Sequence, residues 1–160
     1  MQVAIISDIH DNIWALETAL GRVSGCDVLL CLGDICSPFT MIAIGEGFSG
    51  PIHVVWGNND GDRLHLARSV SGLERVTFHG EFAELELDGR RIAMTHWPDI
   101  AQALAHRPYD VVCHGHNHRR RVDELGGTLL VNPGEVMGRF GERSAAIYDT
   151  SRHTAELVLF

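Results

Sequence analysis

Two histidines placed two residues apart follow a short apolar stretch and form the first candidate site in the chain. Residues 111–113 are apolar enough for a buried strand, and Gly115, His116 and His118 come directly after them. In an extended segment, side chains at positions i and i+2 leave the backbone on the same side, so both imidazoles can reach one metal ion. A polar loop that is merely rich in histidine has the same appearance, and this stretch alone does not decide between the two interpretations.

The same arrangement recurs at four other places in the chain. Apolar runs near residues 3–6, 28–32, 52–56 and 91–95 also end at polar groups. With the first pair, the groups are Asp8, His10, Asp34, Asn58, His96, His116 and His118. Ligands of α/β sheets bind beyond the carboxyl ends of the strands, so these five stretches can converge on one cleft. Each residue alone could be a helix cap, a turn residue or a packed histidine, but those explanations do not account for the recurrence.

The number and kind of these groups indicate more than one metal ion. Seven candidate ligands exceed what one tetrahedral ion needs, but they suit two ions that share a carboxylate, for which Asp34 is the best candidate. Imidazole and carboxylate ligands without thiolate favour transition metals over Mg or Ca. We therefore expect two divalent transition-metal ions, with Mn as the first choice and Ni, Fe, Zn or Co as alternatives.

The elements that must position these groups change in character along the chain. In the first half, buried runs alternate with segments of helical spacing, which is typical of β-α units. The apolar positions Trp14, Leu16 and Ala19 predict the buried face of the first helix. From residue 82 onward, alternating segments around the turn at residues 88–89 predict antiparallel strands. We predict an α/β fold in which two sheets pack face to face with helices outside, as a single domain over residues 1–160.

Composition limits the classes of function. The 160 residues are 45% hydrophobic and 21% charged, and the formal net charge is −8. This acidity disfavours binding to long nucleic acids, which requires clustered basic side chains, and it suits a protein that holds cations. No segment approaches the ~20 apolar residues of a membrane span, and the chain begins with a strand pattern rather than a signal peptide. We expect a cytoplasmic protein with reduced cysteines and no membrane partner, and leave open whether it forms a homo-oligomer.

Taken in order, the motifs resemble those of the calcineurin-like metallophosphoesterases. The matching blocks are Asp-Ile-His at 8–10, Gly-Asp at 33–34, Gly-Asn-Asn-Asp at 57–60, the single His96, and Gly-His-Asn-His at 115–118. The small size and the late Asn-Pro-Gly at 132–134 are most similar to the small bacterial and archaeal phosphodiesterase branch. This resemblance implies a four-layer α/β/β/α sandwich of two mixed sheets and a dinuclear phosphoesterase that acts on a small phosphodiester.

The resemblance also assigns roles to the candidate residues. By this resemblance, the first metal ion would be held by Asp8, His10 and His118, and the second by Asn58, His96 and His116. Asp34 would bridge the two ions. A hydroxide between the ions would attack phosphorus in line with the leaving oxygen. The residues assigned to catalysis are Asp34, Asn58, Asn59 and His96.

The chain departs from the wider family at Asn59, where many members carry the histidine that protonates the leaving group. An amide cannot donate a proton at neutral pH, so we expect substrates with an acidic leaving group. Asn12 and Asn59 are candidates for binding phosphate oxygens, and Arg63 is a weaker one. His114 is a candidate for orienting a ligand histidine.

Other residues near the motifs have two interpretations. Trp56 and Trp97 could stack on a planar part of the substrate, although packing is the commoner role of such residues. The basic run at 119–121 could bind phosphate, but a solvated edge strand explains it better.

A protein-binding scaffold is the alternative from another functional class. The retromer subunit that resembles this family keeps the fold in such a role, and fold alone does not fix function. Ligand completeness distinguishes the two hypotheses, because a scaffold has no need to keep all seven positions, and this chain has them all. The sequence therefore favours the enzyme.

Overall fold

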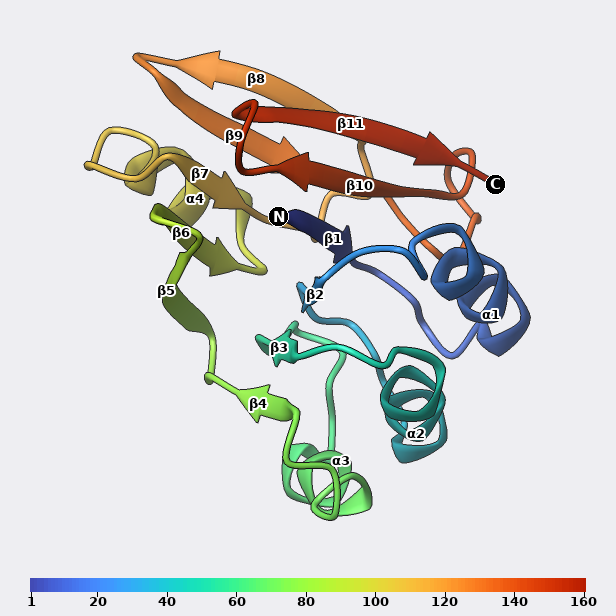
Figure 1. The fold of residues 1–160 in the computed structure, drawn as a ribbon. Coiled ribbons are helices and arrows are strands. Elements are labelled where there is room, and N and C mark those ends of the chain that lie inside the picture. The colour runs from blue at the N-terminus through green and yellow to red at the C-terminus, as the bar shows by residue number, and fades with distance from the viewer.

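The protein forms two β-sheets in a computed structural model that describes residues 1–160 (Figure 1). The strands of the first sheet are β1 (Gln2–Ile6), β2 (Val28–Cys31), β3 (Ile52–Val54), β4 (Val76–Phe78), β10 (Ser144–Asp149) and β11 (Thr154–Leu159). The strands of the second are β5 (Phe82–Leu87), β6 (Arg90–Thr95), β7 (Val111–Cys113), β8 (Arg121–Leu125) and β9 (Thr128–Asn132). The helices are α1 (Ile13–Arg22), α2 (Pro38–Gly47), α3 (Arg63–Ser69) and α4 (Pro98–Leu104).

Three apolar clusters define the layers. The largest lies between the first sheet and α1, α2 and α3, and includes Ile6, Leu16 and Ile44. A second, which includes Ile5 and Leu30, lies between the sheets, and a smaller one packs α4 against the outer face of the second sheet. Alternate residues of β1 therefore enter different clusters, as a strand buried on both faces requires. These are the four α/β/β/α layers and two mixed sheets that the sequence predicts (Figure 1).

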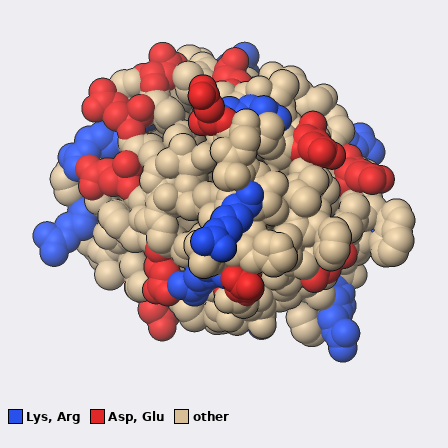
Figure 2. Space-filling model, turned by 90° about the horizontal axis from the view of Figure 1, so that it is seen from below, with Lys and Arg blue, Asp and Glu red and all other residues tan.

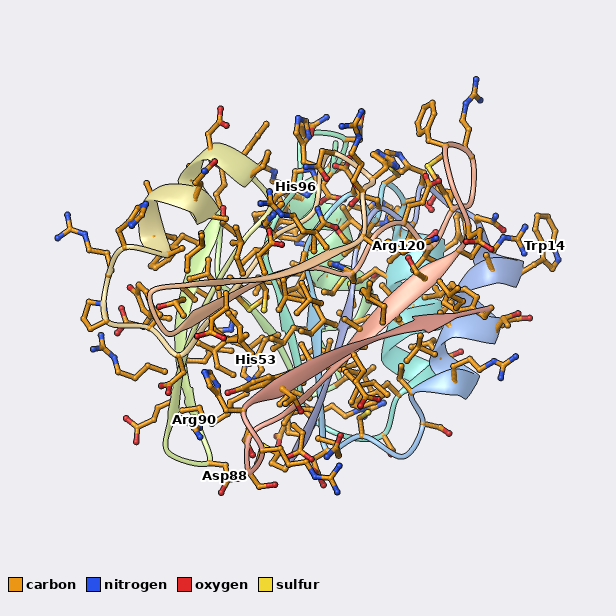
Figure 3. All side chains as sticks on the ribbon, turned by 90° about the horizontal axis from the view of Figure 1, so that it is seen from above. Trp14, His53, Asp88, Arg90, His96 and Arg120 are labelled. Carbon is orange, nitrogen blue, oxygen red and sulfur yellow. The ribbon has the colours of Figure 1, made fainter.

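Parallel pairing brings the important loops to one edge. The first sheet has the strand order β11-β10-β1-β2-β3-β4, in which β1 to β4 are mutually parallel. The second has the order β5-β6-β7-β9-β8, in which β6, β7 and β9 are parallel. Figure 3 places His96 at the end of the molecule opposite Asp88, in the β5–β6 turn, and Arg90, the first residue of β6. The loops that follow β1, β2, β3, β6 and β7 carry the candidate ligands.

The structure differs from the sequence-based expectations at three places. Val76–Phe78 is a parallel strand of the first sheet that was not predicted, because a segment of three residues is too short to show a period. The third strand ends at Val54, before Trp56. Trp14 is 79% exposed and points outward (Figure 3), because Ala15 and Leu16 form the buried side of α1 there.

The distribution of surface charge and the state of the cysteines both match what the composition predicts. On the face shown in Figure 2, acidic side chains and arginines are interspersed and form no continuous basic patch. All four cysteines are unpaired. Burial raises the pKa of Cys31 and of Cys113 to about 12, so both behave as packed thiols.

None of the four helices combines the length and the apolar character that crossing a membrane requires.

Candidate metal centre

The site is built from loops whose backbone is held in an unusual conformation. Five of the seven candidate ligands have positive φ angles between 45° and 72°, namely Asp8, His10, Asp34, His116 and His118. Such conformations persist only where the surroundings enforce them, and they concentrate at functional sites. Here the loops after β1 and β2 are joined, because the N–H groups of Ile9 and His10 both donate to the carbonyl of Asp34 at 3.0 Å.

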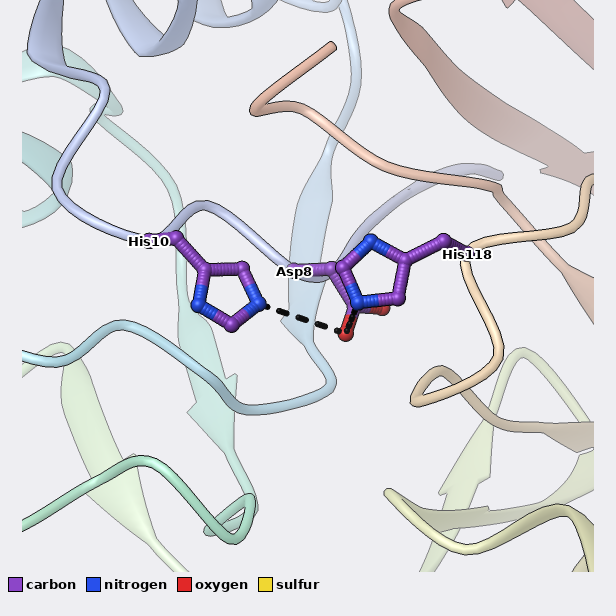
Figure 4. A group of neighbouring side chains, drawn as sticks. All are labelled: Asp8, His10 and His118. Atoms are coloured by element: carbon purple, nitrogen blue, oxygen red, sulfur yellow. Dashed lines mark ion pairs between the residues drawn. The ribbon is translucent and has the colours of Figure 1, made fainter. Parts of the chain in front are cut away.

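Asp8, His10 and His118 form one cluster (Figure 4). The Oδ1 atom of Asp8 lies 4.0 Å from Nε2 of His10 and 3.5 Å from Nε2 of His118. The two imidazole rings are stacked with their centroids 5.3 Å apart. Asp8 is fully buried, whereas both histidines are partly exposed, so this cluster opens toward solvent on one side.

Asp34 connects this cluster to a second one. Its Oδ2 atom lies 3.4 Å from Nε2 of His10 and 3.5 Å from Nε2 of His96. Asp8, Asp34 and His96 also form a compact group of three buried side chains. One carboxylate oxygen therefore lies between two imidazoles that the family resemblance assigns to different metals.

Asn58 brings the remaining candidates into the same site. Its Oδ1 atom lies 3.1 Å from Nε2 of His96 and 2.8 Å from Nδ1 of His116. The backbone N–H of His116 donates to Oδ2 of Asp8 at 3.1 Å. The structure thus brings all seven predicted side chains together from five loops.

The protonation pattern of two histidines leaves nitrogen lone pairs directed inward. Nδ1 of His96 lies 2.7 Å from the carbonyl of Leu32, which can only accept, so this nitrogen carries the proton. Nδ1 of His118 lies 2.7 Å from Oε2 of Glu135, and that contact favours the same tautomer. In each ring Nε2 then carries a lone pair that can bind a cation, among the oxygen atoms of Asn58, Asp34 and Asp8. Oδ1 of Asp8 and Nε2 of His10 are buried and have no hydrogen-bond partner, as expected for ligands of a cation.

Buried negative charge gives an independent reason for a cation here. Asp8, Asp34, Asp60 and Glu135 are each at most 4% exposed. No arginine lies within ion-pair distance of any of them; the charged partners of Asp8, Asp34 and Glu135 are histidines alone, and Asp60 accepts only backbone N–H groups. Burial raises the pKa of Asp8 although His96 and His118 oppose the change. Since buried charges must be paired or coordinate metals, the residues fit divalent cations well.

Asp60 supports the site and was not among the predicted site residues. Its Oδ2 accepts the N–H groups of Gly57 and Asp34 at 2.7 and 3.0 Å, and its Oδ1 accepts those of Ile35 and Cys36 at 2.7 and 2.9 Å. The carboxylate therefore joins the loop after β2 to the loop after β3. Its place at the end of the Gly-Asn-Asn-Asp block was the available signal, but three of its four partners lie 24 to 26 residues away.

Glu135 also escaped the prediction. It is fully buried and accepts hydrogen bonds from His118 and from the N–H groups of Phe140 and Gly141. Burial opposes its ionisation, but these three hydrogen bonds outweigh that effect and place the pKa of Glu135 below its ordinary value. Its position directly after Asn-Pro-Gly was the only signal in the sequence.

Three residues that the sequence offered as phosphate-binding or ligand-orienting groups make other contacts in the structure. Asn12 caps α1 through the N–H of Ala15 and donates to the carbonyl of Met137, so both ends of its amide are engaged. Arg63 pairs with Glu81 and donates to the carbonyl of Gly57. His114 contacts the Gly115 carbonyl and the amide of Asn132 rather than a ligand histidine. These groups are already occupied within the protein.

The two tryptophans and the basic run near the motifs lie in different surroundings. Trp56 is 8% exposed and stacks on Phe78, so packing is its role. Trp97 is half-buried, with its ring 4.9 Å from that of His116 at the rim of the site. Arg120 pairs with Glu142, and Arg121 begins the edge strand β8 and pairs with Asp123. The edge-strand interpretation of the basic run agrees with these contacts.

Asn59 holds the carboxylate of Asp34 in place. Its backbone N–H donates to Oδ1 and its side-chain amide donates to Oδ2, both at 2.8 Å. The residue is exposed, and its amide therefore lies at the solvent side of the site. Asn59 is well placed to orient Asp34.

Gly57 provides a test of how closely the loops must approach. A Cβ atom there would lie 2.2 Å from Oδ1 of Asp34 and 2.5 Å from its backbone nitrogen. We expect Gly57→Ala to displace Asp34 and to lower phosphoesterase activity by at least ~100-fold, since small misplacement of reacting groups has that effect. Gly61→Ala is the matched control, because nothing lies within 4 Å of its Cβ position. Equal activity of the two variants, measured on an aryl phosphodiester, would contradict this view of the loop.

The chain belongs to the calcineurin-like phosphoesterase superfamily, whose domain model matches residues 1–153. It is therefore a hydrolase of phosphate esters. Phosphodiesterase MJ0936 of Methanocaldococcus jannaschii is 29% identical over 158 residues, which is 95% of each chain. Phosphodiesterase YfcE of Escherichia coli is 27% identical, over 85% of this chain and 79% of its own. The solved structure of an archaeal phosphodiesterase aligns with this protein over 100% of both chains, at 26% identity and a TM-score of 0.91.

Proposed function

We propose that the protein is a metal-dependent phosphodiesterase that hydrolyses a small phosphodiester at a centre for two divalent cations. The observation that carries this proposal is the convergence of seven ligand-type side chains around buried carboxylates that no arginine neutralises. The names of the relatives from M. jannaschii and E. coli support the choice of a diester over a monoester. Manganese is our first choice of metal.

The candidate ligands form two groups, one for each cation. Asp8, His10 and His118 would hold one cation, and Asn58, His96 and His116 the other, with Asp34 shared. When bound, such cations lower the pKa of water and neutralise charge on the phosphoryl oxygens. The hydrogen bonds of His96 to the Leu32 carbonyl and of His118 to Glu135 orient the two imidazoles.

The leaving group limits the substrates. Asn59 offers an amide at the solvent side of the site and cannot protonate a departing oxygen. Proton donation by a positioned residue is typically worth about 10²–10⁴-fold, so diesters with an acidic leaving group should react fastest. We further propose that residues 1–160 act as one domain in the cytoplasm, which the four unpaired cysteines support.

Removing the metal tests the proposal directly. Protein treated with a chelator and dialysed should lose its activity on bis(p-nitrophenyl) phosphate, and Mn²⁺ or Ni²⁺ should restore it, with about two ions bound per chain. p-Nitrophenyl phosphate serves as the monoester control and should be hydrolysed more slowly. The absence of bound metal in the presence of Mn²⁺ and Ni²⁺, or full activity in the chelator, would refute the proposal.

A further inference from the structure

Glu135 divides its two carboxylate oxygens between a candidate ligand and a loop. Its Oε2 atom lies 2.7 Å from Nδ1 of His118. Its Oε1 atom accepts the backbone N–H groups of Phe140 and Gly141, each at 2.6 Å. Because the side chain is fully buried, loss of either set of contacts would leave polar groups without partners. Glu135 is thus a rigid connection between the cluster of Asp8, His10 and His118 and the segment 136–143.

The connected segment lies against that cluster and forms part of its rim. The N–H groups of Val136 and Met137 donate to the carbonyls of Ser7 and Asp8, each at 3.1 Å. Phe140 is 71% exposed, yet its ring lies edge-on to His118 with the centroids 5.1 Å apart. A large exposed aromatic ring whose backbone is fixed by a buried carboxylate presents a defined apolar surface beside the site.

We propose that Glu135 is a positioning residue that couples cation binding at His118 to the position of segment 136–143, and through it to the aromatic rim formed by Phe140. The inference rests on the proposed metal centre. An imidazole whose other nitrogen binds a cation is a stronger hydrogen-bond donor, so the contact from His118 to Glu135 tightens when the site is loaded. Coupling is reciprocal, and a well-ordered segment should in turn favour cation binding.

The two oxygens of Glu135 allow the connection to be cut selectively. Glu135→Ala removes both acceptors. Glu135→Gln keeps one carbonyl oxygen, which can accept from His118 or from the segment, but not from both in the present arrangement. Glu142→Gln is the matched control: Glu142 lies in the same segment but is 68% exposed and pairs only with Arg120. A purely structural role for Glu135 would lower stability without changing the response of the segment to metal.

The experiment measures Mn²⁺ affinity by calorimetry and hydrogen exchange of residues 136–143 with and without Mn²⁺, in the full chain. In the wild type, Mn²⁺ should slow exchange of the Phe140 and Gly141 amides. In Glu135→Gln and Glu135→Ala, Mn²⁺ affinity should fall about 10–100-fold, and the Mn²⁺-dependent protection should disappear. In Glu142→Gln, the Mn²⁺ affinity and the Mn²⁺-dependent protection should both stay within twofold of the wild-type values. If Glu135→Ala fails to fold, Glu135→Gln decides the matter.

The two proposals fail in different ways. A wild-type protein that binds neither Mn²⁺ nor Ni²⁺ would refute the metal centre itself. A wild-type protein that binds Mn²⁺, with a Glu135→Gln variant of equal affinity and equal Mn²⁺-dependent protection, would overturn the coupling alone.

Discussion

Asp34→Asn should lower turnover of an aryl phosphodiester by at least ~10³-fold, because removal of even one preorganised electrostatic group typically costs about 10²–10³-fold. Oδ2 of Asp34 lies within 3.5 Å of Nε2 of both His10 and His96, so it is the one oxygen placed between the two halves of the site. An amide of the same shape removes its negative charge. It also turns a donor toward Asn59, which already donates to both carboxylate oxygens.

Asn59→Ala is the matched comparison for this result. It removes the amide that orients Asp34 but leaves the carboxylate itself, so we expect a loss of only about 10–100-fold, as for other residues that orient a ligand. Metal analysis should show that Asp34→Asn binds fewer ions than the wild type while thermal unfolding shows that it remains folded. An Asp34→Asn variant with more than a tenth of wild-type turnover would rule out the bridging role.

Asp60→Ala should produce the largest loss of stability of any single substitution in the site. Four backbone N–H groups, the buried ones of Asp34, Ile35 and Gly57 and the part-buried one of Cys36, would lose their acceptor together. Each buried donor left unsatisfied costs about 1–3 kcal/mol, so the free energy of unfolding should fall by at least ~3 kcal/mol even if the losses are not additive. Denaturant unfolding, with the m-value compared between variants, measures this directly.

Asp62→Ala provides the control for the stability measurement. Asp62 lies two residues further along, is exposed, and caps α3 through a single hydrogen bond from the N–H of His65 at 2.9 Å. Loss of such a cap costs about 1 kcal/mol. Asp60→Asn retains one oxygen and should fall between the two. If Asp60→Ala were no less stable than Asp62→Ala, the carboxylate would not be what holds the two loops together.

The two experiments address different properties of the same loops. Asp34 contributes charge at the site, whereas Asp60 lies behind it and fixes the backbone that presents Asp34. A variant of the first kind should remain folded and lose activity. A variant of the second kind should lose stability, and it should also lose activity to the extent that the released loops displace Asp34.

The sequence by itself identified the candidate ligands of the site. Polar groups that follow apolar runs identify Asp8, His10, Asp34, Asn58 and His96, and the Gly-His-Asn-His block adds the last two candidates. The same runs, with the alternating segments of the second half, indicated an α/β fold of two sheets, because a strand buried on both faces has a continuous apolar pattern that survives in a single sequence. The mixed strand directions and the four layers were implied by the family resemblance. These features are local, so no long-range information was needed to find them.

Only the tertiary structure decided which residues hold the ligands in place. Three of the four N–H groups that donate to Asp60 lie 24 to 26 residues away, and Glu135 reaches His118 across 17 residues, so these contacts leave no local pattern. Apolar periodicity equally misplaced Trp14, since the spacing of apolar residues does not fix which side of α1 meets the sheet. The lone pairs of His96 and His118 point inward because of Leu32 and Glu135, and those partners exist only in the folded chain. Ligand identity is a property of the sequence, whereas ligand orientation depends on contacts that folding creates.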